Sequence, residues 1–253
     1  MVDVDTFLTT LYVMADDLCK TSLPPEPHPG PQAALSRSAV VTLALCGQWQ
    51  RFGSERGFYR YAQRHLRAAL PSLPPREQCN RHVRPQYAAL VAFFLHRVRL
   101  VAARHCAYEA LDSSGVPTRD AKRRGAGWLP GLADSGWSNR LGWYAGCHLL
   151  LAVTPWGMST GFGFGPARTQ DQPLAETCFA LRRSPHPGLA SVGLPACGPY
   201  VVAKGCEGHA LHQTWGRAYG ARVICPPKRH SRVPWPKRLR RWLAGVRQIV
   251  ETV

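Results

Sequence analysis

Two acidic side chains, Asp112 and Glu251, lie in sequence settings that suit metal-ligating carboxylates. Glu251 is the first acidic residue after Glu207, and the segment between them is rich in lysine and arginine. Asp112 follows the short, mainly apolar stretch Ala107–Leu111. Carboxylates bind Mg²⁺ or Mn²⁺, and two such ions can activate a hydroxyl and neutralise the leaving oxygen when a phosphodiester bond breaks. Asp112 and Glu251 are therefore candidate catalytic residues and metal ligands.

Each candidate also has a simpler interpretation. A Ser-Ser-Gly sequence follows Asp112 and favours a turn, so this residue can end a strand through an Asx turn. Glu251 lies four residues after Arg247 and can pair with it on a solvated helix face. Residue type and spacing alone leave both interpretations open.

The excess of positive charge indicates a polyanionic partner. Lysine and arginine number 32 against 15 aspartate and glutamate residues, which gives a formal net charge of +17. Such self-repulsion is best tolerated when nucleic acid neutralises it. A membrane surface is the alternative, but no apolar run approaches the roughly 20 residues that a spanning helix needs. The start, Met1–Asp5, also lacks the basic residues of a signal peptide, so we expect a cytoplasmic protein.

Two basic segments are candidate DNA-binding surfaces. The longer one is interleaved with Trp235 and Trp242, and its alternative interpretation is a solvated charged face. Its basic residues are Lys228, Arg229, Arg232, Lys237, Arg238, Arg240, Arg241 and Arg247. The shorter segment follows Asp112 in the chain and consists of Lys122, Arg123 and Arg124.

The nine cysteines are scattered along the chain without a Cys-x-x-Cys pair. This spacing favours neither a zinc knuckle nor a compact disulfide framework. We expect the cysteines to be reduced, and buried or incidental.

The first 104 residues are predicted to be helical. Apolar residues recur at helical spacing up to about residue 20, and five prolines between positions 24 and 31 then interrupt regular structure. Ser36 or Ser38 can cap the next helix. Further helices are expected from Glu55, over Arg76–Val83 and over about Tyr87–Arg104. This order fits a helix-turn-helix reader of DNA, although any small helical bundle gives a similar pattern.

From about residue 105 the pattern changes to strands and helices in alternation. A first strand is expected to end at Leu111, and a hairpin is expected between residues 143 and 164. A helix, a strand, a second helix and another strand follow, and a final helix begins at about Lys237. We therefore predict an α/β chain, with a helix-turn-helix-like helical region over 1–104 and a ribonuclease-H-like mixed-sheet domain over 105–253.

Three segments, in their order along the chain, resemble bacterial insertion-sequence transposases of the DDE class, most closely insertion-sequence family 982. They are Leu35–Leu43, Asp112–Ser114 and Arg247–Glu251, and the similarity covers essentially all 253 residues. In that family the catalytic acids are an Asp at the end of the first strand, an Asp after the fourth strand, and a Glu on the helix after the fifth. The resemblance implies that Asp112 is the first acid, that Glu251 is the last, and that Arg247 contacts a DNA phosphate.

The resemblance places the middle acid at position 203, where this chain has alanine. The family motif is Asp-x-Gly-aromatic, whereas Ala203–Cys206 lacks both the acid and the aromatic residue. Of the other acids, Asp171 fits a helix cap and Glu207 a helix terminus. Family members also continue beyond the Glu, so the domain is expected to be truncated at its C-terminus. We predict that binding of Mg²⁺ or Mn²⁺ is impaired and that this copy is catalytically inactive.

The activity that the resemblance implies is metal-dependent cleavage at transposon ends and strand transfer into target DNA. Double-stranded DNA is then the partner, a homodimer is allowed, and neither a membrane nor a small-molecule substrate is expected. The implied location is the bacterial cytoplasm, in association with the nucleoid. One alternative is a non-enzymatic DNA-binding remnant of a transposase. Another is a general RNA-binding protein with no preference for duplex DNA ends.

Overall fold

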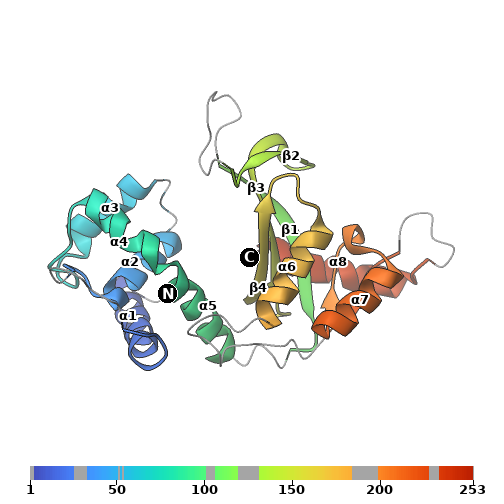
Figure 1. The fold of residues 1–253 in the computed structure, drawn as a ribbon, viewed down its shortest axis with the longest axis horizontal. Coiled ribbons are helices and arrows are strands. Elements are labelled where there is room, and N and C mark those ends of the chain that lie inside the picture. Colours follow the sequence, from blue (N-terminus) through green and yellow to red (C-terminus); the bar gives the residue numbers. More distant parts are fainter. Residues whose placement is uncertain are drawn as a thin grey trace. The chain divides into compact units, whose positions relative to one another are not determined.

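The computed structural model describes residues 3–25, 33–50, 52, 54–100, 106–118, 131–183, 199–227 and 234–252 (Figure 1). These residues form two compact units, of which the first ends at Arg97 and the second begins at Val98. Helices make up the first unit, and a mixed sheet with three helices makes up most of the second. The prediction of an α/β chain with helices before a mixed sheet is confirmed.

The first unit consists of helices, and capping side chains set the starts of the first three. The helices are α1 (Val4–Thr21), α2 (Arg37–Trp49), α3 (Glu55–His65), α4 (Arg76–Val83) and α5 (Tyr87–Leu100), with a 3₁₀ turn (Arg84–Gln86) before α5. Asp3, Ser36 and Ser54 each accept a hydrogen bond from a backbone N–H in the first turn of α1, α2 and α3. Such caps satisfy donors that a helix start leaves without an intrahelical partner. Of the two serines considered for α2, Ser36 is the cap.

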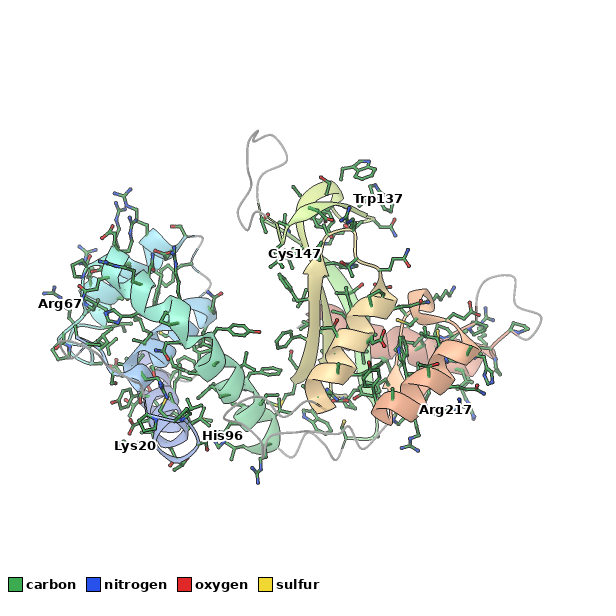
Figure 2. The ribbon with its side chains drawn as sticks, viewed as in Figure 1. Lys20, Arg67, His96, Trp137, Cys147 and Arg217 are labelled. Carbon is green, nitrogen blue, oxygen red and sulfur yellow. The ribbon has the colours of Figure 1, made fainter. Side chains whose placement is uncertain are left out.

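The core of the first unit forms around α2, which is buried on nearly every side. α1 packs against α2 along its stripe of buried leucines and alanine, and the rings of Phe7 and Trp49 stack 4.0 Å apart. α3 differs, because Ala62 is the only residue of this helix that is buried. Most of α3 therefore remains available to solvent, and Figure 2 shows Arg67, just beyond its end, on the outside of this unit.

The second unit contains one mixed sheet. Its strands are β1 (Glu109–Pro117), β2 (Asp134–Ser138), β3 (Gly142–Val153), β4 (Ser159–Pro166), β5 (Tyr200–Val201) and β6 (Val223–Ile224). The strand order is β2-β3-β1-β5-β6, and β4 also pairs with β3. The pairs that involve β3 are antiparallel, whereas β5 is parallel to both β1 and β6.

Helices cover both faces of this sheet. α6 (Asp171–Arg183) and α7 (His209–Tyr219) form a core with Leu111, and the buried rings of Phe179 and Trp215 meet edge to face within it. On the other face, Val246 of α8 (Lys237–Thr252) is buried with Ala110 and Val201. Successive strand residues point to opposite faces, which explains why neighbouring residues of β1 contact different helices. Figure 1 shows α6 in front of the sheet and α8 behind it.

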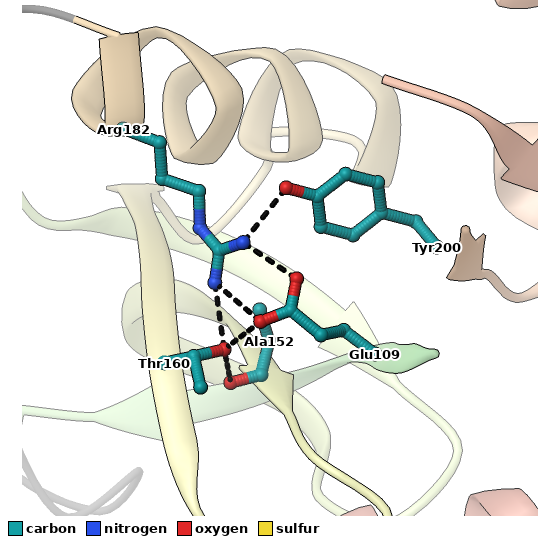
Figure 3. A network of polar contacts seen from close by, with 5 residues as sticks. All are labelled: Glu109, Ala152, Thr160, Arg182 and Tyr200. Carbon is teal, nitrogen blue, oxygen red and sulfur yellow. Dashed lines mark hydrogen bonds and ion pairs between the residues drawn. The ribbon is translucent and has the colours of Figure 1, made fainter. Parts of the chain in front are cut away.

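A buried polar network links β1 to α6 (Figure 3). Arg182 Nη1 and Nη2 contact the two carboxylate oxygens of Glu109 at 2.5 and 2.8 Å. The same guanidinium donates to the hydroxyls of Tyr200 and Thr160, at 2.7 and 2.6 Å. Burial alone would lower the pKa of Arg182, but the hydrogen bonds and charge of Glu109 hold that pKa above its usual value. Arg182 is therefore charged, and the network joins β1, β4, β5 and α6.

Two strand predictions differ from the structure. The first strand was expected to end at Leu111, but β1 continues to Pro117, because it pairs with β3 from Ala110 onward. Asp112 thus lies within a strand and not at its end, and the ladder overrides the turn preference of the Ser-Ser-Gly sequence. β2 was not predicted, because Asp-Ser-Gly-Trp-Ser has the composition of a turn.

Candidate functional site

The candidate site is a pocket beside the free part of one edge of β1. β5 pairs with β1 only at Glu109 and Ala110, whereas β3 follows the other edge as far as Pro117. Beyond Ala110, β1 therefore has a strand partner on one side only, among the described residues. A cavity of about 870 Å³ lies here. Its lining includes Asp112, Ser114, Trp137, Arg140, His148, Asp171 and Ala203.

Asp112 and Ala203 both line this pocket, although 91 positions separate them in the sequence. Asp112 is two residues after Ala110, and Ala203 is two residues after Val201, so both follow residues whose side chains face α8. The backbone at Ala203 is still extended. The structure thus brings the predicted first acid and the position predicted for the middle acid together. Asp112 is half-buried, and its Oδ1 accepts a hydrogen bond of 3.0 Å from the N–H of Ser113.

Glu251, the other predicted catalytic residue, lies on α8. The helix continues to Thr252, so Glu251 lies in its last turn. Val246 is buried against the sheet in the same cluster as Ala110, and α8 also contacts β3. The backbone of Glu251 therefore belongs to the element that packs on the Asp112 face of the sheet. The side chains of Glu251 and Arg247 lie outside the described residues.

Asp171 is a pocket residue that sequence reasoning assigned only to a helix cap. It is the first residue of α6, and its Oδ1 accepts a hydrogen bond of 2.6 Å from the hydroxyl of Ser113. Its Oδ2 lies against the Cα of Gly205, where a β-carbon would collide with it. Burial, followed by the charge of Asp171, raises the pKa of the Cys206 thiol to about 12. No local pattern could indicate that Ser113, 58 positions earlier, is the partner of Asp171.

The described pocket residues do not supply a complete donor set for two metal ions. Asp112 and Asp171 offer carboxylate oxygens, but Asp171 is already held by Ser113 and packed on Gly205. Ala203, where the resemblance expects an acid, offers only a methyl group. Over the parts of the chain that the structure describes, no group of three His, Cys, Asp or Glu side chains is arranged to hold a metal ion.

The predicted DNA-binding residues are only partly described. Four of them are exposed on the first two turns of α8: Lys237, Arg238, Arg240 and Arg241. Lys228, Arg229, Arg232, Lys122, Arg123 and Arg124 lie outside the described residues. Trp242 is partly exposed on the same helix, and its ring makes an edge-to-face contact, 5.4 Å between ring centroids, with Tyr108, the residue before β1. The basic start of α8 is thus held on the sheet by aromatic and aliphatic packing.

The end of the β2–β3 hairpin forms a second wall of the pocket, which sequence reasoning missed. Trp137 and Trp143 are register partners and are 58% and 74% exposed, respectively. Exposed Arg140 lies in the turn between them, and it lines the pocket together with Trp137. Figure 2 labels Trp137 at this end of the sheet. Large aromatic rings beside a guanidinium are groups on which nucleic-acid bases stack. The role of Trp137 and Arg140 was missed because β2, and therefore the hairpin that places them at the pocket, was not predicted.

Comparisons with models of protein families, with curated proteins and with solved structures find no match to this chain. Among the described residues, no helix combines the length and apolar character that crossing a membrane requires.

Proposed function

We propose that this protein is a DNA-binding chain of the DDE transposase lineage whose metal-dependent nuclease centre is inactive. The observation that carries the proposal is the pocket shared by Asp112 and Ala203. These are the positions at which the transposase resemblance expects the first and the middle acid. The resemblance assigns both positions to one metal centre, so their place in one pocket supports it.

The arrangement of the sheet supports a ribonuclease-H-like domain. β1, β3 and β4 form consecutive antiparallel pairs, and the short strands β5 and β6 continue the sheet in parallel on the other side of β1. Helices follow β4, β5 and β6 in the chain. A ribonuclease-H-like domain has this order of elements. In such a domain one acid lies on the first core strand, one just after the fourth, and one on the helix after the fifth. In this chain the first, fourth and fifth core strands are β1, β5 and β6, and the helix after β6 is α8.

The loss of one ligand explains why we infer an inactive centre. Metal ions lower the barrier of phosphodiester chemistry by several kcal/mol of charge stabilisation, and about 1.4 kcal/mol corresponds to a tenfold change in rate. A methyl group at position 203 cannot take part in that coordination. Asp171 does not replace it without giving up its hydrogen bond from Ser113. Binding of DNA would survive, because contacts to phosphates depend on cationic side chains and not on the metal.

The resemblance implies duplex DNA as the partner, and the positive charge of the chain supports a polyanion. The net charge is +17. The first turn of α8 contains exposed basic residues and no acidic side chain. The rival function is that of a general RNA-binding protein, which would bind RNA and duplex DNA ends without distinction.

A cleavage assay with matched variants tests the proposal. The wild-type chain is mixed with duplexes that carry the terminal repeats flanking its gene, in the presence of Mg²⁺ or Mn²⁺. We expect binding without nicking, and we expect Ala203→Asp to gain metal-dependent nicking. Ala203→Ser controls for a polar side chain of similar size, and Asp112→Asn in the Ala203→Asp background should remove any gained activity.

Each result bears on a different part of the proposal. Nicking by the wild-type chain that Asp112→Asn abolishes would overturn the inactive assignment but keep the lineage. A lack of nicking by Ala203→Asp would count against Ala203 as the main defect. Equal affinity for RNA and for duplex ends would favour the rival function.

A further inference from the structure

A groove rich in arginine lies in the first unit, and none of the basic residues singled out above as DNA contacts belongs to it. It has a volume of about 600 Å³ and is formed by α3, the segment after it and the start of α4. Its cationic lining consists of Arg56, Arg60, Arg67 and Arg76, and Tyr59, Gln63 and Glu77 also contribute. Among the described residues, this groove combines more arginines than the pocket around Asp112, which contains Arg140 alone.

The spacing of residues along α3 produces this cationic face. Arg56, Arg60 and Gln63 recur at intervals of four and three, which places them on one side of a helix, and Arg67 continues the series after the helix ends. Ala62 and Leu66 are buried on the side that faces the core. The three arginines at 56, 60 and 67 are exposed.

Packing fixes the shape of the groove. The hydroxyl of Tyr59 donates a hydrogen bond of 2.7 Å to the carbonyl of Pro74, which ties α3 to the proline turn before α4. Leu73, a lining residue, is buried, and its N–H bonds to the carbonyl of Leu70. Hydrogen bonds and packing within the protein therefore hold the backbone that carries the arginines, and no ligand is needed to position it.

Carboxylates neutralise little of this charge. Glu77 pairs with Arg76 at 3.0 Å, and Glu55 accepts a hydrogen bond from the amide of Asn80. No carboxylate among the described residues pairs with Arg56, Arg60 or Arg67. Like charges held close together repel one another, and a polyanion that enters the groove removes that cost.

We propose that this groove binds the phosphodiester backbone of duplex DNA, so that the first unit contributes its own DNA-binding surface. The inference rests on the proposed function, which supplies DNA as the partner, and it specifies where the first unit contacts it. Arg56 and Arg60 lie about 6 Å apart along the axis of α3, so the row spans successive phosphates and is too long for a single small anion. Arginine suits phosphates because its planar group donates in pairs. A membrane surface fits less well, because interfacial binding also needs an exposed apolar face, whereas the groove leucine, Leu73, is buried.

The salt dependence of duplex binding tests this surface in the full chain. The groove variant is Arg56→Gln/Arg60→Gln/Arg67→Gln. The control variant, Arg81→Gln/Arg84→Gln/Arg97→Gln, removes the same charge from exposed positions of the same unit that do not line the groove. Each phosphate contact contributes about 0.9 to the slope of log affinity against log salt, so loss of three contacts reduces that slope by about 2.7. We expect this reduction, with a loss of affinity at least about tenfold greater than in the control.

The outcomes separate the groove from the proposed function. If the wild-type chain binds duplex DNA and the two triple variants weaken it equally, only net charge matters and the groove is not a binding surface. If the wild-type chain does not bind duplex DNA, the proposed function is wrong, and the groove proposal, which rests on it, is wrong as well. Tighter groove-dependent binding to RNA or to anionic lipid vesicles would overturn the choice of partner. Arg60→Lys, which keeps the charge, should retain the wild-type slope, and circular dichroism should report an unchanged helix content for every variant.

Discussion

At the scale of single residues, the pocket is lined by two carboxylates that belong to different elements. Asp112 lies on the face of β1 toward α8, whereas Asp171 is engaged by Ser113 and packed on the Cα of Gly205. Gly205 has no unusual backbone angle, so only space restricts its side chain. The glycine of the Ala-Lys-Gly-Cys sequence is therefore explained by the carboxylate beside it.

This contact leads to a prediction for Gly205→Ala. The new methyl group would push the Asp171 carboxylate away from Ser113, and overpacking of this kind costs about 1 to 3 kcal/mol in the free energy of unfolding. Urea denaturation measures the loss. Gly245→Ala is the control, because a methyl group there meets no neighbour, and the change should stabilise α8 slightly. If Gly205→Ala costs as much in an Asp171→Ala background as in the wild type, the explanation is wrong.

At the scale of elements, the Glu109–Arg182 pair is the buried ion pair between the sheet and α6. The side chains are 2% and 5% exposed, so removal of one partner leaves a charge buried without its counterion. We expect Arg182→Met to lower the free energy of unfolding by about 3 to 5 kcal/mol. Replacement of both partners, Glu109→Leu/Arg182→Met, should recover most of this loss, because a buried ion pair and a packed apolar pair are often equally stable.

A surface pair provides the comparison for this prediction. Lys20 and Asp16 are four residues apart on α1, and the Lys20 side chain is 73% exposed. Lys20→Met should change the free energy of unfolding by less than about 1 kcal/mol. Chemical denaturation of all three variants measures the difference. A small effect of Arg182→Met would mean that water reaches Glu109.

Helices were predictable from this sequence because their signals are local. Ser36, Ser54 and the proline before α4 mark helix starts, and the structure begins helices directly after them. Strands were less predictable, because their extent depends on distant partners. β1 continues through Ser113, Ser114 and Gly115 only because β3 lies beside it, and β2 exists only by pairing with the start of β3.

The same limit applies to the candidate site. Asp112 was a candidate from its own sequence, whereas position 203 entered only through the transposase resemblance, because alanine gives no chemical signal of a site. Asp171 could not be recognised as a pocket residue, since its partner Ser113 lies on another element. The groove of Arg56 and Arg60 was also missed, because arginines on a short amphipathic helix look the same whether solvent or a ligand faces them.

At the scale of the whole molecule, the net charge of +17 has opposite consequences for stability and for binding. Salt screens self-repulsion, since the Debye length falls from about 10 Å at 0.1 M to about 3 Å at 1 M. The same ions compete with the protein for phosphates. We expect the thermal unfolding midpoint to rise over this range of NaCl while the affinity for duplex DNA falls. A midpoint that falls with salt would show that attractive ion pairs outweigh repulsion in the folded state.

The alternation along β1 makes this strand sensitive to changes in length. Its odd-numbered residues Glu109 and Ser113 engage α6, and its even-numbered residues Ala110 and Asp112 follow the opposite face. Loss or gain of one codon within the strand would exchange the two sets, so that Glu109 would leave the interior or Asp112 would enter it. A relative of this chain should therefore align through the strand without insertion or deletion.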